Sequence, residues 1–301
     1  MRRHSQFVGF VIIQQLLNGI SLGMSYALMA VGFSLIFGTL RLIYFAQGAI
    51  YAFGALTTIW FTSFHWGILP AILLAAILTG ILGIVIDKTA LKPLRAKNSI
   101  PIASLITTIG LANIIQNLLT IAFGSQKRAF PALFNYGAIT VGDVQIRSSQ
   151  IAMVVLSLLL LVALTLIISR TKIGLAMRAT EQNKRAASLM GIDVNYVISF
   201  TFFLAGVSAA IAGVLIGGYY QIAYPGMGFM VGLKAFAAAV LGGIGSLPGA
   251  IIGGIVIGIS ESFAAMLFGA TYRDAVAFII LILVLIIMPS GFLGKKGINK
   301  V

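Results

Sequence analysis

Three amide side chains lie close together within one apolar stretch of the sequence. Asn113, Gln116 and Asn117 are spaced i, i+3 and i+4, so on a helix they share one face. Polar groups surrounded by apolar residues need a partner or a purpose. Two roles fit: the amides line a path for a polar solute, or they hydrogen-bond to a neighbouring helix, at about 0.6 kcal/mol each. Gln47 and Tyr51 form a similar pair, four residues apart.

Lys234 and Glu261 are the charged residues that lie deepest within apolar stretches. At about 1.5 Å per helical residue, both lie roughly 8–10 Å from the same edge of the apolar region. Equal depth on neighbouring stretches predicts an ion pair, because an unpaired buried charge is costly. Such a pair is either structural or binds the carboxylate and ammonium groups of a zwitterionic substrate.

The sequence has few residues suited to metal binding, ATP binding or catalysis. The chain has no cysteine and only two histidines, His4 and His65, so we expect neither disulfides nor a metal site. It lacks the G-x-x-x-x-G-K-[ST] sequence that binds the phosphates of ATP. No nucleophile with a neighbouring base can be named. We therefore expect a protein that is not an enzyme and binds no cofactor of its own.

The composition indicates the setting of these residues. Of the 301 residues, 60% are hydrophobic and 9% are charged, whereas soluble domains carry roughly 25% charged residues. Apolar runs of about 20 residues, the length of a bilayer-spanning helix, recur throughout. The sequence thus predicts an all-α, polytopic membrane protein with one transmembrane domain over 1–301. Nine spans are predicted, at 17–38, 45–64, 68–86, 102–123, 151–169, 196–217, 229–244, 249–268 and 275–288.

Two features of these spans are open. The seventh span is short and glycine-rich, so it is either a full crossing or re-entrant, which leaves eight or nine spans. The residues from 7 to 16, which include Gln14 and Gln15, are expected to form an interfacial segment before the first span.

Glycine spacing predicts how the spans pack. Pairs four residues apart let helix backbones approach closely, and they occur at Gly213 and Gly217, Gly249 and Gly253, and Gly254 and Gly258. The glycine-rich run 242–249 predicts a tight turn between the seventh and eighth spans.

Lysine and arginine predict the orientation. With the segment 87–100 inside, 13 of the 20 basic residues lie on the inner side, six lie outside and Lys234 lies within a span. The C-terminus is then cytoplasmic and the N-terminus external, with Arg2 and Arg3 running against the rule. Cytoplasmic loops account for the net charge of +14, so no nucleic-acid partner is expected. The longest outer loop, 124–150, is the expected surface for an external partner.

The cytoplasmic segment 170–193 has a readable local structure. Thr180 is predicted to cap a helix, and Glu181 lies in the first turn, where negative charge is favoured. Gly191 is predicted to end that helix in the left-handed conformation, and Asp193 to cap the next one. One apolar face is formed by Ala186, Leu189 and Met190. A helix of about ten residues is marginal alone, so we expect it to contact a partner protein.

Two stretches carry a resemblance to a known family. The first contains Met177-Arg178-Ala179, Asn183, Ala187 and Gly191-Ile192, and the second is KAFAAAVLGGIGSLPGA at 234–250. With further similarity from Asn18 to Gly291, the chain resembles the LivH-type permease of bacterial branched-chain amino acid ABC importers. It departs from the family at Tyr44, where an Asn usually precedes Phe-Ala, and the substrate range differs if that position contacts solute.

The resemblance implies a function, a location and partners. The chain would be the permease subunit that moves branched-chain or related hydrophobic amino acids across the bacterial inner membrane into the cytoplasm. A separate ATPase would use the ATP. Further partners would be a second, LivM-like permease subunit and a periplasmic substrate-binding protein.

The resemblance also implies roles for particular residues. The short cytoplasmic helix would dock in a cleft of the ATPase, and the residues expected to couple the two subunits are Arg178, Thr180, Glu181, Asn183, Ala186, Ala187, Leu189, Met190 and Gly191. The candidate translocation path comprises Gln47, Asn113, Gln116, Asn117, Lys234 and Glu261.

Other transport classes remain open from the residues. The substrate of an importer could be urea, another small amide or a polar amino acid. An ion-coupled secondary transporter would need inverted repeats and ion ligands at the midplane, and neither is clear in the sequence. A passive channel would need rings of repeated pore-lining residues, which one chain does not show.

Overall fold

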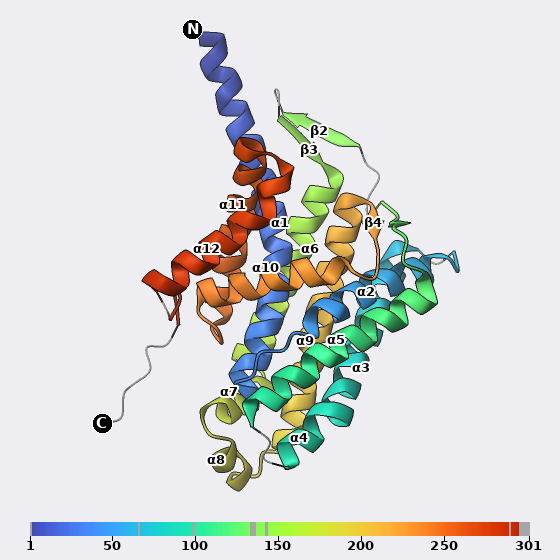
Figure 1. Cartoon of the computed structure of the whole chain (residues 1–301), viewed down its shortest axis with the longest axis vertical. Coiled ribbons are helices and arrows are strands. Elements are labelled where there is room, and N and C mark those ends of the chain that lie inside the picture. Colours follow the sequence, from blue (N-terminus) through green and yellow to red (C-terminus); the bar gives the residue numbers. More distant parts are fainter. Residues whose placement is uncertain are drawn as a thin grey trace.

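The computed structural model describes residues 2–65, 67–97, 100–132, 137–141, 144–288 and 290–294. These residues form a bundle of helices with two small β-sheets (Figure 1). The longer helices are α1 (Arg2–Leu40), α2 (Gln47–Thr62), α3 (Ile68–Ile86), α5 (Pro101–Phe123), α6 (Ser148–Arg170), α9 (Val194–Tyr220), α10 (Met227–Gly242), α11 (Leu247–Phe268) and α12 (Arg273–Ile287). The shorter elements are η1 (Asp87–Leu91), α4 (Lys92–Ala96), α7 (Lys172–Gln182), α8 (Lys184–Leu189) and η2 (Ala270–Tyr272).

Each of the nine predicted spans coincides with one of the longer helices. Among the described residues, seven helices are long and apolar enough to cross a membrane. The other two, α2 and α10, have 16 residues each and so reach only about 24 Å. Both consist mostly of buried residues, although Trp60 near the end of α2 and Phe229 and Met230 near the start of α10 are exposed.

Helix α1 is the central element of the bundle. It packs along α9, α10 and α11, and most of its apolar length is buried. The residues before Leu17, predicted to form an interfacial segment, are joined to the first predicted span in one helix that continues without a break from Arg2 (Figure 1). The amides there have partners that a straight helix can reach. Gln14 exchanges two hydrogen bonds with the Gln145 backbone, at 3.0 and 3.1 Å.

Close glycine contacts hold α11 between α1 and α10. A Cβ atom at Gly253 would overlap the Ala238 carbonyl oxygen of α10, and one at Gly254 would overlap the Ala27 backbone of α1. The short helices α2 and α10 meet in the same way, at Gly48 and Gly228. Small residues thus allow the backbones to approach, as the glycine spacing predicts.

The run 242–249 forms the predicted tight turn. Gly243 and Gly245 have φ values of 102° and 87°, which residues with a Cβ adopt at a cost. Ser246 then caps α11 by accepting a hydrogen bond from the Gly249 N–H at 3.3 Å.

The chain after α12 caps the end of α10. The N–H groups of Phe292 and Leu293 donate to the carbonyls of Leu241 and Gly242, each at 2.9 Å. These carbonyls belong to the last turn of α10, where a helix leaves its acceptors without partners of its own. The segment around residue 292 is therefore tied to the turn between α10 and α11.

The predicted inner and outer segments lie at opposite ends of the bundle. Helices α4, α7 and α8 gather at the lower end in Figure 1, and the hairpin of β2 (Ala138–Val141) and β3 (Val144–Arg147) lies at the upper end. The hairpin belongs to the loop 124–150, in which β1 (Arg128–Ala129) also pairs with β4 (Ile222–Ala223). The described residues of this loop therefore form two short strand pairings.

Candidate functional site

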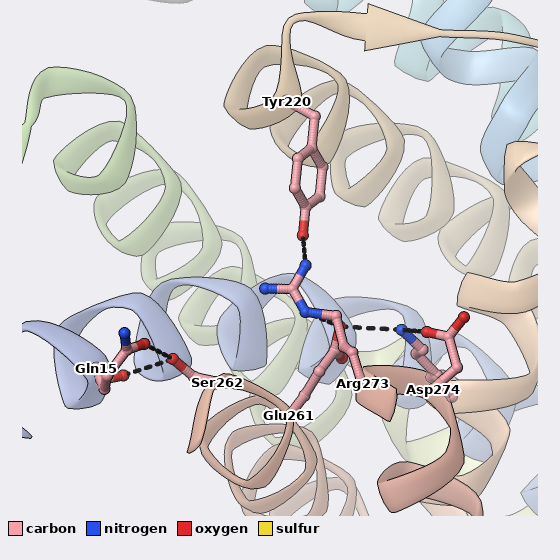
Figure 2. A network of polar contacts seen from close by, with 7 residues as sticks. Gln15, Tyr220, Glu261, Ser262, Arg273 and Asp274 are labelled. Atoms are coloured by element: carbon pink, nitrogen blue, oxygen red, sulfur yellow. Dashed lines mark hydrogen bonds and ion pairs between the residues drawn. The ribbon is translucent and has the colours of Figure 1, made fainter. Parts of the chain in front are cut away.

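Four charged side chains meet where α10, α11 and α12 come together (Figure 2). Lys234 Nζ lies 3.0 Å from Glu261 Oε1 and 2.5 Å from Asp274 Oδ1. Arg273 Nε lies 3.1 Å from the same Glu261 oxygen. Arg273 also donates a hydrogen bond of 2.6 Å to the Tyr220 hydroxyl at the end of α9. Two positive and two negative charges thus form one neutral network.

The predicted contact between Lys234 and Glu261 is present and deeply buried. Their side chains are 6% and 1% exposed. The Lys234 ammonium also lies 5.8 Å from the centre of the Tyr26 ring on α1, within reach of a cation–π interaction. Because both charges already have partners within the protein, the geometry favours the structural interpretation of this pair over direct substrate binding.

Arg273 and Asp274 are functional candidates that sequence reasoning missed. Both lie just before the last predicted span, at 275–288, and η2 turns the chain so that α12 begins beside Glu261. Gly269 starts this turn with a φ of 92°. The sequence offered one signal for them: they are adjacent residues of opposite charge that follow the span carrying Glu261.

Figure 2 also shows how α11 is tied to α1. The Ser262 hydroxyl, one residue after Glu261, lies 2.9 Å from the Gln15 backbone oxygen and 2.7 Å from Gln15 Oε1. Asn18, one turn along α1, accepts a hydrogen bond of 2.6 Å from Gln150 at the start of α6. The charge network therefore lies within a larger set of polar contacts that joins α1, α6, α9, α10, α11 and α12.

A second buried charge, Asp87, was also missed. It is fully buried at the start of η1, a π-helical turn that follows α3. Its carboxylate lies 2.6 Å from Arg95 and accepts a hydrogen bond of 2.7 Å from Ser199 on α9. Asp87 thus joins α4 to α9 at the lower end of the bundle. Sequence reasoning missed it because it comes directly after an apolar span, within a run of basic residues.

The predicted amide residues do not form one group. Asn113 and Gln116 line a cavity of about 260 Å³ with residues of α2 and α10, among them Gly48 and Phe229. Asn117 is exposed and does not line it.

Two further polar residues are buried away from this cavity. Gln47 is fully buried and donates a hydrogen bond of 2.9 Å to the Ala205 carbonyl. Tyr44, the departure from the family, is 1% exposed and contacts the Phe202 ring at 5.1 Å between centroids. Neither residue lines the cavity at Asn113.

The segment 170–193 forms two helices where the sequence predicts one. Thr180 is not an N-cap: it lies inside α7 and is 1% exposed. The cap is Asn183, whose side-chain oxygen accepts hydrogen bonds from the N–H groups of Arg185 and Ala186 at 3.0 and 3.1 Å. The helix therefore starts at Lys184, because an Asn side chain outcompetes the continuing helix for these donors.

The predicted end of the helix is correct. Gly191 has a φ of 83°. Its N–H donates to the Ser188 carbonyl at 3.0 Å, and the Ile192 N–H donates to the Ala187 carbonyl at 3.1 Å. These two bonds define a Schellman motif. Asp193 then caps α9, as predicted, by accepting hydrogen bonds from two N–H groups in its first turn, at 3.0 and 3.1 Å.

The apolar side of α8 is exposed. Leu189 and Met190 are 88% and 82% exposed, and Ala186 is also exposed, whereas Ala187 faces the body of the protein at 4%. Two adjacent large apolar side chains therefore face solvent at the C-terminal end of α8.

The other predicted coupling residues lie on α7, against the bundle. Arg178 donates a hydrogen bond to the Ile168 carbonyl at the end of α6. The Glu181 carboxylate approaches the end of α1, since a Cβ atom at Gly38 would lie 3.5 Å from it. Helix α7 therefore connects the exposed α8 to the ends of α1 and α6.

Basic side chains surround the start of α8. The pKa of Lys184 is lowered, first because the side chain loses hydration and then because Arg95 and Arg41 add positive charge nearby. A molecule that docks at α8 would therefore meet a positive surface. No group of three or more His, Asp and Glu side chains that could hold a metal ion occurs in the described parts of the chain.

Comparisons with known proteins give a consistent result. The family described as branched-chain amino acid transport system / permease component matches residues 15–285. The chain is 39% identical to the high-affinity branched-chain amino acid transport system permease protein BraD of Pseudomonas aeruginosa, covering 96% of this chain and 98% of that protein. It is 38% identical to the corresponding protein LivH of Escherichia coli, covering 98% and 99%. LivH of Salmonella typhimurium is likewise 38% identical over 98% and 99%.

Proposed function

The chain belongs to the family of branched-chain amino acid transport system permease components, and we infer that it is the membrane-spanning permease subunit of an ABC importer for these amino acids. It is a multi-pass membrane protein and a transport subunit rather than an enzyme. The observation that carries this function is the match over residues 15–285, which reaches all nine helices that the sequence predicts to span the membrane.

We further propose that α8 docks on a cytoplasmic ATPase subunit. The support is physical: a six-residue helix, capped at both ends, presents Leu189 and Met190 to solvent beside basic residues. A cleft with an apolar centre and an acidic rim would complement it. The ATPase would supply the nucleotide site, since the permease sequence has no phosphate-binding loop.

A second permease subunit would cover α5. This helix is among the least buried of the spans, and it exposes the amides of Asn113 and Asn117 in its apolar middle. Amides exposed to lipid are costly. We therefore propose that a homologous subunit packs on this face and that the amides line the substrate path between the two subunits. The whole polytopic domain would act as a single unit.

We propose a bacterial inner-membrane location with the end that carries α4, α7 and α8 in the cytoplasm. Basic residues are concentrated on the elements at this end: Lys88 in η1, Arg95 in α4 and Arg185 in α8, with Arg41 close to Lys184. The periplasmic substrate-binding protein would then dock at the end that carries the β2–β3 hairpin.

Uptake by the complete complex tests this function. The permease pair, the ATPase and the binding protein are reconstituted in vesicles, and uptake of labelled leucine, isoleucine, valine and urea is measured with ATP inside. We expect ATP-dependent uptake of the three amino acids and none of urea. Uptake of urea alone would contradict the substrate, and uptake driven by an ion gradient without ATP would contradict the importer class.

A further inference from the structure

A cavity of about 610 Å³ lies between the ends of α1, α7, α10 and α12. Its volume is in the range of small-molecule sites, which are mostly apolar with a few convergent polar groups. The apolar wall includes Phe236 and Val240 of α10 and Leu285 of α12. The polar wall includes Arg178 and Glu181 of α7. The cavity is separate from the charge network on α10, α11 and α12 and from the smaller cavity beside α5.

The two charges in this wall have opposite signs and lie three residues apart on one helix. Residues with this spacing are neighbours on the helix surface, roughly 5–6 Å apart at Cβ. Arg178 uses part of its guanidinium to donate to the Ile168 carbonyl, and the group has five N–H donors in all. A carboxylate and an ammonium on one carbon atom, as in a free amino acid, match this arrangement of charges.

The third polar group in the wall is the hydroxyl of Ser34 on α1. Ser34 of α1 is 2% exposed, and its hydroxyl has no hydrogen-bond partner among the described residues. It also lines the cavity. Leaving a buried hydroxyl without a hydrogen-bond partner is unfavourable. A polar group of a bound ligand would satisfy it.

We propose that this cavity binds a free amino acid with an apolar side chain from the cytoplasmic side. Arg178 binds its carboxylate, Glu181 binds its ammonium group, Ser34 hydrogen-bonds to one of them, and the apolar wall contacts the side chain. The proposal rests on the proposed function, from which both the class of ligand and the cytoplasmic position follow.

A ligand in this cavity would act on the coupling segment. Arg178 and Glu181 belong to α7, which leads directly into α8, so a bound amino acid would hold α7 against α1 and α10. Helix α8 would then be less free to follow the ATPase. The accumulated product would thereby slow its own import, as expected when one ligand shifts the equilibrium of a distant site.

Import into product-loaded vesicles tests the proposal. The complete complex is reconstituted with ATP inside, together with no amino acid, L-leucine or glycine, and the initial rate of labelled leucine uptake is measured. We expect internal L-leucine to lower the rate about fivefold or more, in the usual range of coupling between sites. Glycine should have little effect, because it has no side chain to contact the apolar wall.

Two variants test the site itself. Leu285→Trp fills the cavity, and Leu283→Trp is the matched control, because Leu283 is similarly exposed on α12 and does not line the cavity. Each rate is compared with the same variant's rate without internal leucine. Leu285→Trp should lose most of the inhibition, whereas Leu283→Trp should keep it. Ser34→Val, a smaller change, should weaken it.

A binding measurement covers variants that transport poorly. Equilibrium dialysis of labelled L-leucine against the purified complex, without the binding protein, should show weaker binding to Leu285→Trp than to Leu283→Trp. The proposal is overturned if internal leucine has no effect on the unmodified complex, or inhibits Leu285→Trp equally. Absence of any ATP-driven leucine uptake would instead contradict the proposed function, so the two failures are distinguishable.

Discussion

The buried charges between α10, α11 and α12 share their partners. Glu261 contacts both Lys234 and Arg273, and Lys234 contacts both Glu261 and Asp274. Asp274 is 43% exposed, so the network reaches solvent at one edge. Shared partners reduce the cost of burying each charge, and they join three helices at one point.

Substitutions at Lys234 and Glu261 test this arrangement. Lys234→Met and Glu261→Gln should each lower the free energy of unfolding by about 2 kcal/mol, less than the cost of a fully unpaired charge because Arg273 and Asp274 remain. The double variant should recover part of the loss, since Arg273 and Asp274 still balance. Thermal unfolding and folded yield in detergent measure both effects. Additive losses would mean that the two residues are not coupled.

Asp87 makes the comparable contact at the other end of the bundle. Asp87→Ala removes the ion pair with Arg95 and the hydrogen bond from Ser199, so it should lower stability by about 3 kcal/mol. Ser199→Ala removes only the hydrogen bond and should cost about 1 kcal/mol. Thermal unfolding of the purified variants checks the difference. Equal losses would show that the ion pair with Arg95 contributes nothing.

At the scale of single residues, depth within a span predicted which two buried charges pair. It did not predict the other residues that contact them. Counting residues from the edge of the apolar region was enough to pair Lys234 with Glu261. Arg273 and Asp274 of α12 could not be assigned in the same way, because their position depends on how η2 turns the chain.

Helix α8 is held in shape mainly by local contacts rather than by packing against the bundle. Asn183 begins it and Gly191 ends it, both through local hydrogen bonds, while Ala187 is its buried residue. Its shape is therefore set locally and its apolar side is left for a partner. A short helix of this kind keeps its orientation through its caps.

The apolar side of α8 should matter for transport and little for folding. Leu189→Asp should leave membrane abundance normal, because an exposed substitution usually changes stability by less than about 0.5 kcal/mol. It should abolish ATP-driven uptake and release the ATPase on purification, since a charge would be buried in the docking cleft. Ser188→Asp, which adds the same charge at the neighbouring exposed position, is the matched control. Normal uptake by Leu189→Asp would remove α8 from the coupling mechanism.

The turn at Gly191 should affect coupling through geometry alone. A side chain at Gly191 would have free space around it, so Gly191→Val introduces no clash. A β-branched residue at a φ of 83° nevertheless costs about 1–3 kcal/mol. Helix α8 should then lose its orientation and transport should fall strongly at normal abundance. Uptake at matched expression, with Lys184→Ala as a mild surface control, checks this. Unchanged uptake would mean that the orientation of α8 is irrelevant.

Sequence patterns predicted the end of this element better than its start. A glycine followed by an apolar residue has few structural alternatives, so Gly191 was assigned correctly. Thr180 and Asn183 are both suitable caps. The choice between them depends on α7, which packs against α1 and α6 and so continues past Thr180 to Gln182.

For the whole molecule, the helices at the nine predicted spans could be located because hydrophobic length is a strong signal. The positions of α2 and α10 within the bundle could not be predicted. These helices are short and largely buried in the bundle, so their position depends on glycine contacts between distant parts of the chain. Cavities between helices, including the one at Arg178, likewise arise only when the helices pack.

The orientation of the bundle is open to a direct test, because the chain contains no cysteine and single cysteines can be introduced without background. Ser188→Cys on α8 should be protected from a membrane-impermeant thiol reagent in intact cells, and Ser125→Cys, after α5, should be labelled once the outer membrane is made permeable. Both serines are exposed, so a difference in labelling reports the side of the membrane rather than burial. Both cysteines should react fully once the inner membrane is disrupted. Labelling of Ser188→Cys in intact cells would reverse the orientation, and neither ATPase docking at α8 nor a cytoplasmic site at Arg178 would then hold.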